Sequence, residues 1–430
     1  MYDPMANAPA TTSRSPIARV LALRDFRLLF GGTTTSTLGD QFYLIATPWL
    51  VLQLTKDPLA LGVVIALGGI PRAILMLLGG AVTDRFSPRR VLIAADVLRL
   101  IITALLAAAV FADGVQMWML YAASLGFGIV AGFAIPAGNS IVPMLVEDDD
   151  LSAGNSIILG STQLAGFVGP TLAGLLIGGL SESRSGIALA YAVDSISFIA
   201  SAAALLAMRA GRKRGGASAR PEGILESIGI GVRYLWNDEA LRLMFIVVTA
   251  VNFLFIGPML VGIPVLAHQY LPEGAVAYGL LVSSLAGGSL AGYLLAAQLP
   301  RPGGRAIRIL LLGALGAFGL AIGSLGFLRW TAVLAVLMVL LGFGNGYLSI
   351  LVLTWIQSRT PREMLGRMMS MLMLTNTGLS PISQAVSGAV IRWSLPALFA
   401  AAGGGLLLVP LWAASQPALE RVSEELGKKT

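Results

Sequence analysis

Long apolar runs alternate with short polar connections along almost the whole chain. Dividing the chain at these connections predicts twelve apolar stretches, each able to cross a bilayer as an α-helix of about 20 residues. The runs are continuous and rich in Leu, Ala and Gly, whereas the strands of a membrane β-barrel alternate apolar with polar side chains. The predicted fold class is therefore an all-α membrane protein with twelve transmembrane helices. Their expected limits are 28–54, 59–82, 91–112, 117–145, 153–179, 187–208, 241–268, 277–299, 306–328, 331–356, 367–391 and 395–414.

One long polar connection, 209–240, divides the predicted spans six and six. It carries a basic run and then an amphipathic stretch, 223–236, which we expect to lie on the membrane surface. The expected organisation is an N-terminal tail, a first six-helix bundle, a central loop, a second six-helix bundle and a C-terminal tail. Their limits are 1–27, 28–208, 209–240, 241–414 and 415–430.

Short sequence matches relate the two halves of the chain. Leu-Gly-Phe-Gly at 125–128 recurs at 341–344, and Pro48 matches Pro264 at the same offset of 216 residues. Six spans return the chain to the side on which it started, so two such copies share one orientation. The matches predict two bundles related by a parallel pseudo-two-fold repeat, as in transporters whose halves rock about a central site.

The composition narrows the chemistry. Hydrophobic residues make up 56% of the chain and charged residues only 12%, which leaves too few polar side chains to cover a water-soluble surface. The chain has no Cys, and its single His, His268, falls at the outer end of a span, so thiolate and zinc sites are excluded. We expect no cofactor, no metal and no catalytic residues.

The distribution of basic residues predicts the orientation. If the N-terminus is cytoplasmic, 23 of the 29 Lys and Arg fall in cytoplasmic segments, four fall in outer loops, and Arg72 and Arg99 lie within spans. This asymmetry follows the positive-inside rule and predicts that both termini and the 209–240 loop are cytoplasmic. It also explains the net charge of +7 without a nucleic-acid partner.

A motif stands at the end of the second predicted span. Residues 80–90 read Gly-Ala-Val-Thr-Asp-Arg-Phe-Ser-Pro-Arg-Arg. This loop resembles the signature of the major facilitator superfamily, in which Gly and an Asp-Arg pair are followed by Gly and basic residues. Two positions depart from the signature, since Ser87 replaces the second Gly and Pro88 replaces the first closing basic residue. The resemblance implies a conformational latch against the start of span eleven, with the candidate residues Gly80, Asp84, Arg85, Arg89 and Arg90.

The resemblance covers almost the whole chain. It implies that spans 1, 4, 7 and 10 line a central cavity, that spans 2, 5, 8 and 11 form the rocking contacts, and that the other spans support them from outside. A second element in span five, Gly169-Pro170 with Gly174, resembles the Gly-Pro kink of the family's exporters. Softer patterns resemble the bacterial branch of macrolide-efflux and enterobactin-exporter-like proteins. The resemblance therefore implies an exporter in a bacterial inner membrane.

Ionisable side chains inside spans are costly and point to functional positions. Asp40 and Arg72 lie about 18 Å and about 17 Å from the cytoplasmic edge at about 1.5 Å per residue, so they can meet at one level. We expect Asp40 to carry a coupling proton and Arg72 to set its affinity, with a permanent structural pair as the alternative. Asp194 is a further candidate for proton coupling, or a structural carboxyl hydrogen-bonded to its neighbours. Asp96 and Arg99 are expected to form an intrahelical pair that supports the latch.

Polar and aromatic side chains on the presumed cavity helices are candidates for substrate contact, with packing or lipid-facing roles as the alternative: Tyr43, Trp49, Asn252, Phe253, Asn345, Tyr347 and Trp355.

These features predict a monomeric secondary transporter that exchanges protons for an amphiphilic organic molecule, such as a drug, macrolide or siderophore, by alternating access. Its partners would be the small-molecule substrate, protons and membrane lipid. A lipid flippase or nutrient importer of the same fold is the nearest alternative. A membrane enzyme or sensor is another, but an enzyme needs acid, base or nucleophile groups clustered at one membrane face, which the sequence lacks beyond residues 80–90. The chain also has no nucleotide-binding Gly-x-x-x-x-Gly-Lys-Ser/Thr loop.

Overall fold

A computed structural model of the chain describes residues 15–180, 184–209, 224–298 and 304–426. Every regular element in these ranges is a helix, which confirms the all-α fold class. The elements are α1 (Pro16–Ala22), α2 (Arg24–Thr55), α3 (Pro58–Arg85), α4 (Pro88–Phe111), α5 (Met117–Leu145), the short η1 (Asp148–Asp150), α6 (Leu151–Gly179), α7 (Arg184–Ala207), α8 (Ile224–Asn237), α9 (Glu239–Gly257), η2 (Pro258–Gly262), α10 (Ile263–Tyr270), α11 (Ala275–Gln298), α12 (Gly304–Leu325), α13 (Thr331–Arg359), α14 (Arg362–Thr377), α15 (Ser380–Ile391), α16 (Leu395–Ala414) and α17 (Ala418–Leu426).

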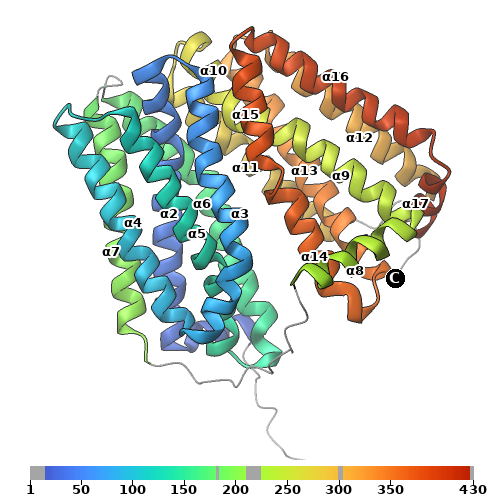
Figure 1. Cartoon of the computed structure of the whole chain (residues 1–430), viewed down its shortest axis with the longest axis horizontal. Coiled ribbons are helices and arrows are strands. Elements are labelled where there is room, and N and C mark those ends of the chain that lie inside the picture. The colour runs from blue at the N-terminus through green and yellow to red at the C-terminus, as the bar shows by residue number, and fades with distance from the viewer. Residues whose placement is uncertain (1–14, 181–183, 210–223, 299–303, 427–430) are drawn as a thin grey trace, which may run out of the picture.

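The long helices form two bundles, one from α2–α7 and one from α9–α16 (Figure 1). In the view of Figure 1 the bundles converge at the top and separate toward the bottom. They meet where α3 packs against α15 and where α6 packs against α11. In chain order these helices correspond to spans 2, 11, 5 and 8, for which the resemblance implies contacts between the halves.

The two ends of the molecule differ in charge. One end, called the basic end here, carries α1, α8 and the connection between α3 and α4 with its arginines. The other end, called the opposite end, carries the connections between α2 and α3 and between α15 and α16. The bundles therefore converge at the opposite end.

Ten of the described helical segments are long and apolar enough to cross a membrane. The helix α2 and the α14–α15 pair, which correspond to the expected first and eleventh spans, are not among these ten. α2 carries the polar run 33–37, Thr-Thr-Thr-Ser-Thr, and α14 and α15 are separate helices. Lower hydropathy is typical of membrane helices that line a polar cavity or bury polar groups against neighbouring helices. The count of twelve spans stays a prediction.

Two spans expected to be continuous are interrupted. The expected span 367–391 is divided between α14 and α15 at residues 378–379, because Pro381 has no N–H to continue the hydrogen-bond ladder of α14. The span around Pro258 contains a π-helical turn, η2. Ser383 joins the two irregular regions, since its hydroxyl accepts a hydrogen bond from Gly257 N–H at 3.0 Å and donates one to the Phe253 carbonyl. Side-chain hydroxyls commonly satisfy backbone groups freed in this way.

The N-terminal tail contains a helix that the hydropathy pattern did not predict. Ser15 caps α1, with its hydroxyl accepting a hydrogen bond from Ala18 N–H at 3.3 Å. Arg19 of α1 then donates two hydrogen bonds to the carboxylate of Asp150, at 2.6 and 3.2 Å. The tail is thus fastened to the acidic loop between α5 and α6.

Close backbone contact between α6 and α11 requires small residues. A Cβ atom placed on Gly174 would lie 2.6 Å from the Ala275 carbonyl oxygen, whereas a Cβ on Gly166 of the same helix would meet nothing within 4 Å. Glycine and other small residues allow membrane helices to approach in this way.

We expect Gly174→Val to force α6 and α11 apart and Gly166→Val to leave them in contact. The chain has no Cys, so a single cysteine at Ser283, which is 3% exposed in this contact, reports on its opening. N-ethylmaleimide should modify Ser283→Cys faster in the Gly174→Val background than in the Gly166→Val control. Equal rates in the two backgrounds would contradict the prediction.

Candidate functional site

A group of charged side chains lies inside the first bundle. Asp40 is on α2, Arg99 is on α4 and Asp194 is on α7. Gly39 permits close contact between α2 and α7 here, because a Cβ on Gly39 would lie 2.9 Å from a carboxylate oxygen of Asp194. Arg99 attracts both carboxylates, and the two carboxylates repel each other. We refer to Asp40, Arg99 and Asp194 as the charge cluster.

The charge cluster contains buried polar atoms that have no hydrogen-bond partner among the described residues. Asp194 is fully buried, at 0% exposure, and neither carboxylate oxygen has a hydrogen-bond partner among the described residues. The Arg99 Nε atom likewise has none there. Asp40 is half-buried, so of the two carboxylates it is the one closer to solvent. A buried ionised group without hydrogen bonds is strongly unfavourable, so a change of protonation has large energetic consequences at this site.

Aromatic rings surround Arg99. Its guanidinium carbon lies 5.9 Å from the ring centre of Phe127 and 5.7 Å from that of Phe198. Tyr43 stacks on Phe127 with ring centres 4.2 Å apart and meets Tyr191 edge to face. The rings fill the space around the cation and favour it by cation–π attraction, which is stronger where water is excluded.

The structure pairs the expected charges differently. Arg72 makes no ion pair within the described residues, and its Nε atom has no hydrogen-bond partner there. Asp40 has Arg99 as its attracting cation instead. Asp194 was expected to be hydrogen-bonded to neighbours if structural, and it lacks such bonds. Asp96 is buried one helical turn before Arg99, and no ion pair joins the two side chains, although Arg99 still attracts the Asp96 carboxylate.

The predicted latch residues fall into three groups. The surroundings of Gly80 and the side chain of Asp84 lie outside the described part of the structure. Arg85 and Arg90 are exposed at the basic end. Arg89 donates hydrogen bonds to the Leu205 and Leu206 carbonyls at 2.6 and 2.8 Å, so it satisfies the last carbonyls of α7. Arg89 therefore joins the start of α4 to the end of α7, rather than facing lipid headgroups.

The Gly-Pro element lies at the contact between the bundles. Gly169 allows α2 to approach, since a Cβ there would lie 2.5 Å from Gln41 Cγ. Pro170 breaks the hydrogen-bond ladder of α6, and the next N–H, that of Thr171, donates across the interface to the Ser283 hydroxyl of α11 at 3.0 Å. The helix irregularity thus supplies a hydrogen bond to the other bundle.

The expected substrate residues do not form one group. Trp49 and Trp355 are 1% and 3% exposed and belong to packed clusters, and Tyr43 packs against Phe127. Phe253 bonds through its carbonyl to α15, and Tyr347 stacks on Phe343 with ring centres 6.4 Å apart. Two of the candidates, Asn252 and Asn345, line one cavity, in the second bundle.

The opposite end is closed by contacts that sequence reasoning missed. Arg392, after α15, donates two hydrogen bonds to the Asp57 carboxylate before α3, at 2.6 and 3.1 Å. Trp49 meets His268 of the other bundle edge to face, with ring centres 4.9 Å apart. The available signal for the ion pair was an isolated acid and an isolated base in two outer loops. Nothing in the linear sequence brings those loops together.

Residues 29–384 match the model of the Major Facilitator Superfamily. The chain belongs to this superfamily. The multidrug efflux pump Tap of Mycobacterium tuberculosis is 27% identical over 379 residues, covering 84% of this chain and 86% of that pump. The enterobactin exporter EntS of Escherichia coli is 25% identical over 400 residues, covering 89% of each chain. The solved nucleoside transporter NupG has a TM-score of 0.72 at 12% identity, covering 91% of this chain and 99% of that chain, which shows the shared fold.

Membership in the superfamily makes the chain a multi-pass membrane transporter of small molecules and not an enzyme. This confirms the expected fold and rejects the enzyme alternative. The two bundles that meet at the opposite end are the expected parts of such a transporter.

The Asp57–Arg392 pair predicts how closure depends on pH. Hydrogen bonds from Arg392 lower the pKa of Asp57 below its ordinary value of about 3.9. Asp57 therefore stays ionised as the pH falls toward that value, and the stabilisation is lost only when the pH falls through the lowered pKa. The contribution of this ion pair to closure of the opposite end should accordingly stay constant between neutral and mildly acidic pH.

Asp57→Asn removes the charge but keeps an oxygen that can cap α3, as Asp57 does through Leu59 N–H at 3.0 Å. We expect the variant to open the opposite end more often, by no more than about fivefold, because 53% of the Arg392 side chain is exposed and such pairs are weak. Labelling of a cysteine at Ser283 should report this change. The swap Asp57→Arg with Arg392→Asp should reverse it, and a swap that labels as fast as Asp57→Asn would contradict an ion-pair role.

Proposed function

We propose that the protein exports an amphiphilic organic molecule across a bacterial inner membrane, in exchange for protons and by alternating access. The names of two relatives support export, since one is a multidrug efflux pump and the other an enterobactin exporter. The excess of Lys and Arg at the basic end supports a cytoplasmic location for that end and for both termini. The protein would work as a monomer, with the six-helix bundles 28–208 and 241–414 as its moving parts.

The observation that carries proton coupling is the unpaired burial of Asp194 beside Asp40 and Arg99. The two carboxylates and one guanidinium of the charge cluster carry a net charge of about −1 when all are ionised, and Asp96, whose carboxylate Arg99 also attracts, adds negative charge nearby. Binding one proton makes the group neutral and removes the repulsion between the carboxylates. A site with one cation for two acids therefore favours the uptake of one proton.

Access to the charge cluster has a direction. Asp40 is half-buried and Asp194 is fully buried, so a proton from a water-filled cavity would reach Asp40 first. Arg99 would then pair with Asp194 alone. Loss of that proton would return Arg99 to a position shared between both carboxylates. Two arrangements of one cation between two acids provide a switch that movement of α2 against α4 and α7 can bias.

In this proposal the predicted latch acts at the basic end. α14 begins at Arg362, runs past Gly366 and contacts α3, the helix that carries Asp84. Asp84 would accept hydrogen bonds from the start of α14 when the basic end closes. In the described conformation the bundles converge at the opposite end, so the proposal assigns it to an inward-facing state.

Asp40→Asn should abolish transport driven by a proton gradient, because the amide cannot take up the proton. The substrate would first be found by comparing the sensitivity of a deletion strain to dyes, macrolides and siderophores. Transport of that compound in proteoliposomes should then fall to the level of protein-free vesicles for Asp40→Asn, while equilibrium binding persists.

Two controls separate coupling from folding. Asp113→Asn, at an exposed loop of the opposite end, removes an acid outside the charge cluster and should transport normally. Arg72→Gln should retain coupling if Arg99 is the cation that matters. Gradient-driven transport that persists in Asp40→Asn would exclude Asp40 as the proton carrier.

A further inference from the structure

A cavity of about 260 Å³ lies within the second bundle and is separate from the charge cluster. Its walls come from α9, α12 and α13, and one residue each from α14 and α16 and two residues of α17 complete them. Every lining residue belongs to these helices, so the cavity lies inside one bundle and not between the two. Its volume is close to the lower end of the range for small-molecule sites, about 300–1,000 Å³.

The lining is chemically uniform apart from three polar side chains. Aliphatic side chains, with Met244 and Phe318, form most of the surface, and none of the lining residues is ionisable. The polar exceptions are Asn252, Asn345 and Ser349. The Asn345 amide makes no hydrogen bond within the described residues, so its donors and acceptor can serve a ligand.

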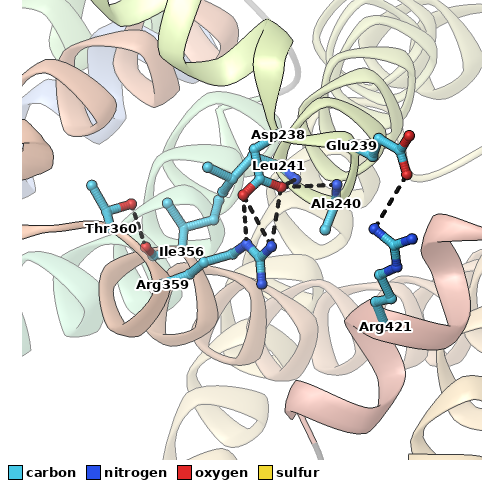
Figure 2. A network of polar contacts seen from close by, with 8 residues as sticks. All are labelled: Asp238, Glu239, Ala240, Leu241, Ile356, Arg359, Thr360 and Arg421. Atoms are coloured by element: carbon cyan, nitrogen blue, oxygen red, sulfur yellow. Dashed lines mark hydrogen bonds and ion pairs between the residues drawn. The ribbon is translucent and has the colours of Figure 1, made fainter.

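A polar network joins α9 and α13, two helices that line the cavity (Figure 2). The Asp238 carboxylate caps α9 by accepting hydrogen bonds from Ala240 and Leu241 N–H at 2.9 and 3.0 Å. Arg359, at the end of α13, donates to the same carboxylate at 3.0 and 3.2 Å. This network fixes the start of α9 and the end of α13. These two helices carry the three polar residues of the lining, Asn252 on α9 and Asn345 and Ser349 on α13.

The helix α17 covers one side of the cavity. Leu419 and Val422 of α17 are 5% and 0% exposed and both line the cavity. An ion pair of 3.4 Å between Arg421 and Glu239 holds α17 beside the start of α9 (Figure 2). The cavity is thus lined mainly by apolar side chains, and α17 covers one side of it. Its hydrogen-bonding side chains lie on α9 and α13.

We propose that this cavity binds the apolar body of an uncharged amphiphile and that Asn345 hydrogen-bonds its polar group. The inference deepens the proposed function, on which it rests, by naming the substrate class. Apolar side chains favour apolar ligand surface, and the amide fixes one polar group. An ionised group placed in this lining would lose its hydration and gain no opposite charge. The site therefore selects a neutral compound over a charged compound of the same shape.

Two probes of nearly the same shape test this selection. N-phenyl-1-naphthylamine is uncharged, and 1-anilinonaphthalene-8-sulfonate carries a sulfonate on the same ring system. The readout is the rate at which N-ethylmaleimide modifies a single cysteine at Ser349, an exposed residue of the cavity rim, in proteoliposomes. The chain has no other Cys that could react.

We expect N-phenyl-1-naphthylamine at ten times its dissociation constant to slow this labelling about tenfold and the sulfonate to leave it unchanged. Val352→Trp, which places a ring inside the cavity, should abolish the protection. Val336→Trp, on the exposed face of the same helix α13, should keep it. Equal protection by both probes, or slow labelling that neither probe alters because lipid chains fill the cavity, would overturn the proposal.

Transport separates the failure of this inference from the failure of the proposed function. If wild-type protein exports no compound, the proposed function fails. If wild-type protein exports the identified substrate and Val352→Trp exports it as well as Val336→Trp does, the cavity is not its binding site. Export that is lost in Val352→Trp and retained in Val336→Trp supports both.

Discussion

The attraction of one arginine, Arg99, for two carboxyl groups inside an apolar bundle is the interaction on which the proposed mechanism depends. Charged groups are unfavourable in such surroundings, and Asp194 lacks hydrogen bonds to offset that cost. Arg99 offsets part of it, and the aromatic rings of Phe127 and Phe198 lie beside the cation. Because one cation cannot fully neutralise two acids, the proposed uptake of one proton is assigned to this group.

The proposed response to a proton would act through the contacts between helices of the two bundles. At the opposite end, glycines allow backbone contact between α6 and α11, and Asp57 and Arg392 add a weak ion pair. Weak ion pairs and contacts between small residues suit an interface that must open and close, because a strong buried interface would hold the protein in one state. Hydroxyl groups such as Ser283 and Ser383 satisfy backbone groups where prolines interrupt the helices.

Apolar periodicity was sufficient to predict the helices, because a span of about 20 residues is a local property of the sequence. It did not predict the break near Pro381 or the helix α1, whose stabilising partner Asp150 is far away in the chain. Depth arithmetic suggested that Asp40 meets Arg72, since both lie at one level. Depth does not fix the rotation of a helix about its axis, and in the structure Arg99 of α4, rather than Arg72, is the cation that attracts Asp40.

The most direct test of the central claim is to measure both ends of the protein while the pH changes. Spin labels on Ala112 and Phe327 would report on the opposite end, and labels on Ser87 and Ser370 on the basic end, all at exposed positions. Between about pH 5 and about pH 9, the two distances should change in opposite directions, and Asp40→Asn should remove the pH dependence. Distances that do not depend on pH, or that change unaltered in Asp40→Asn, would contradict the account.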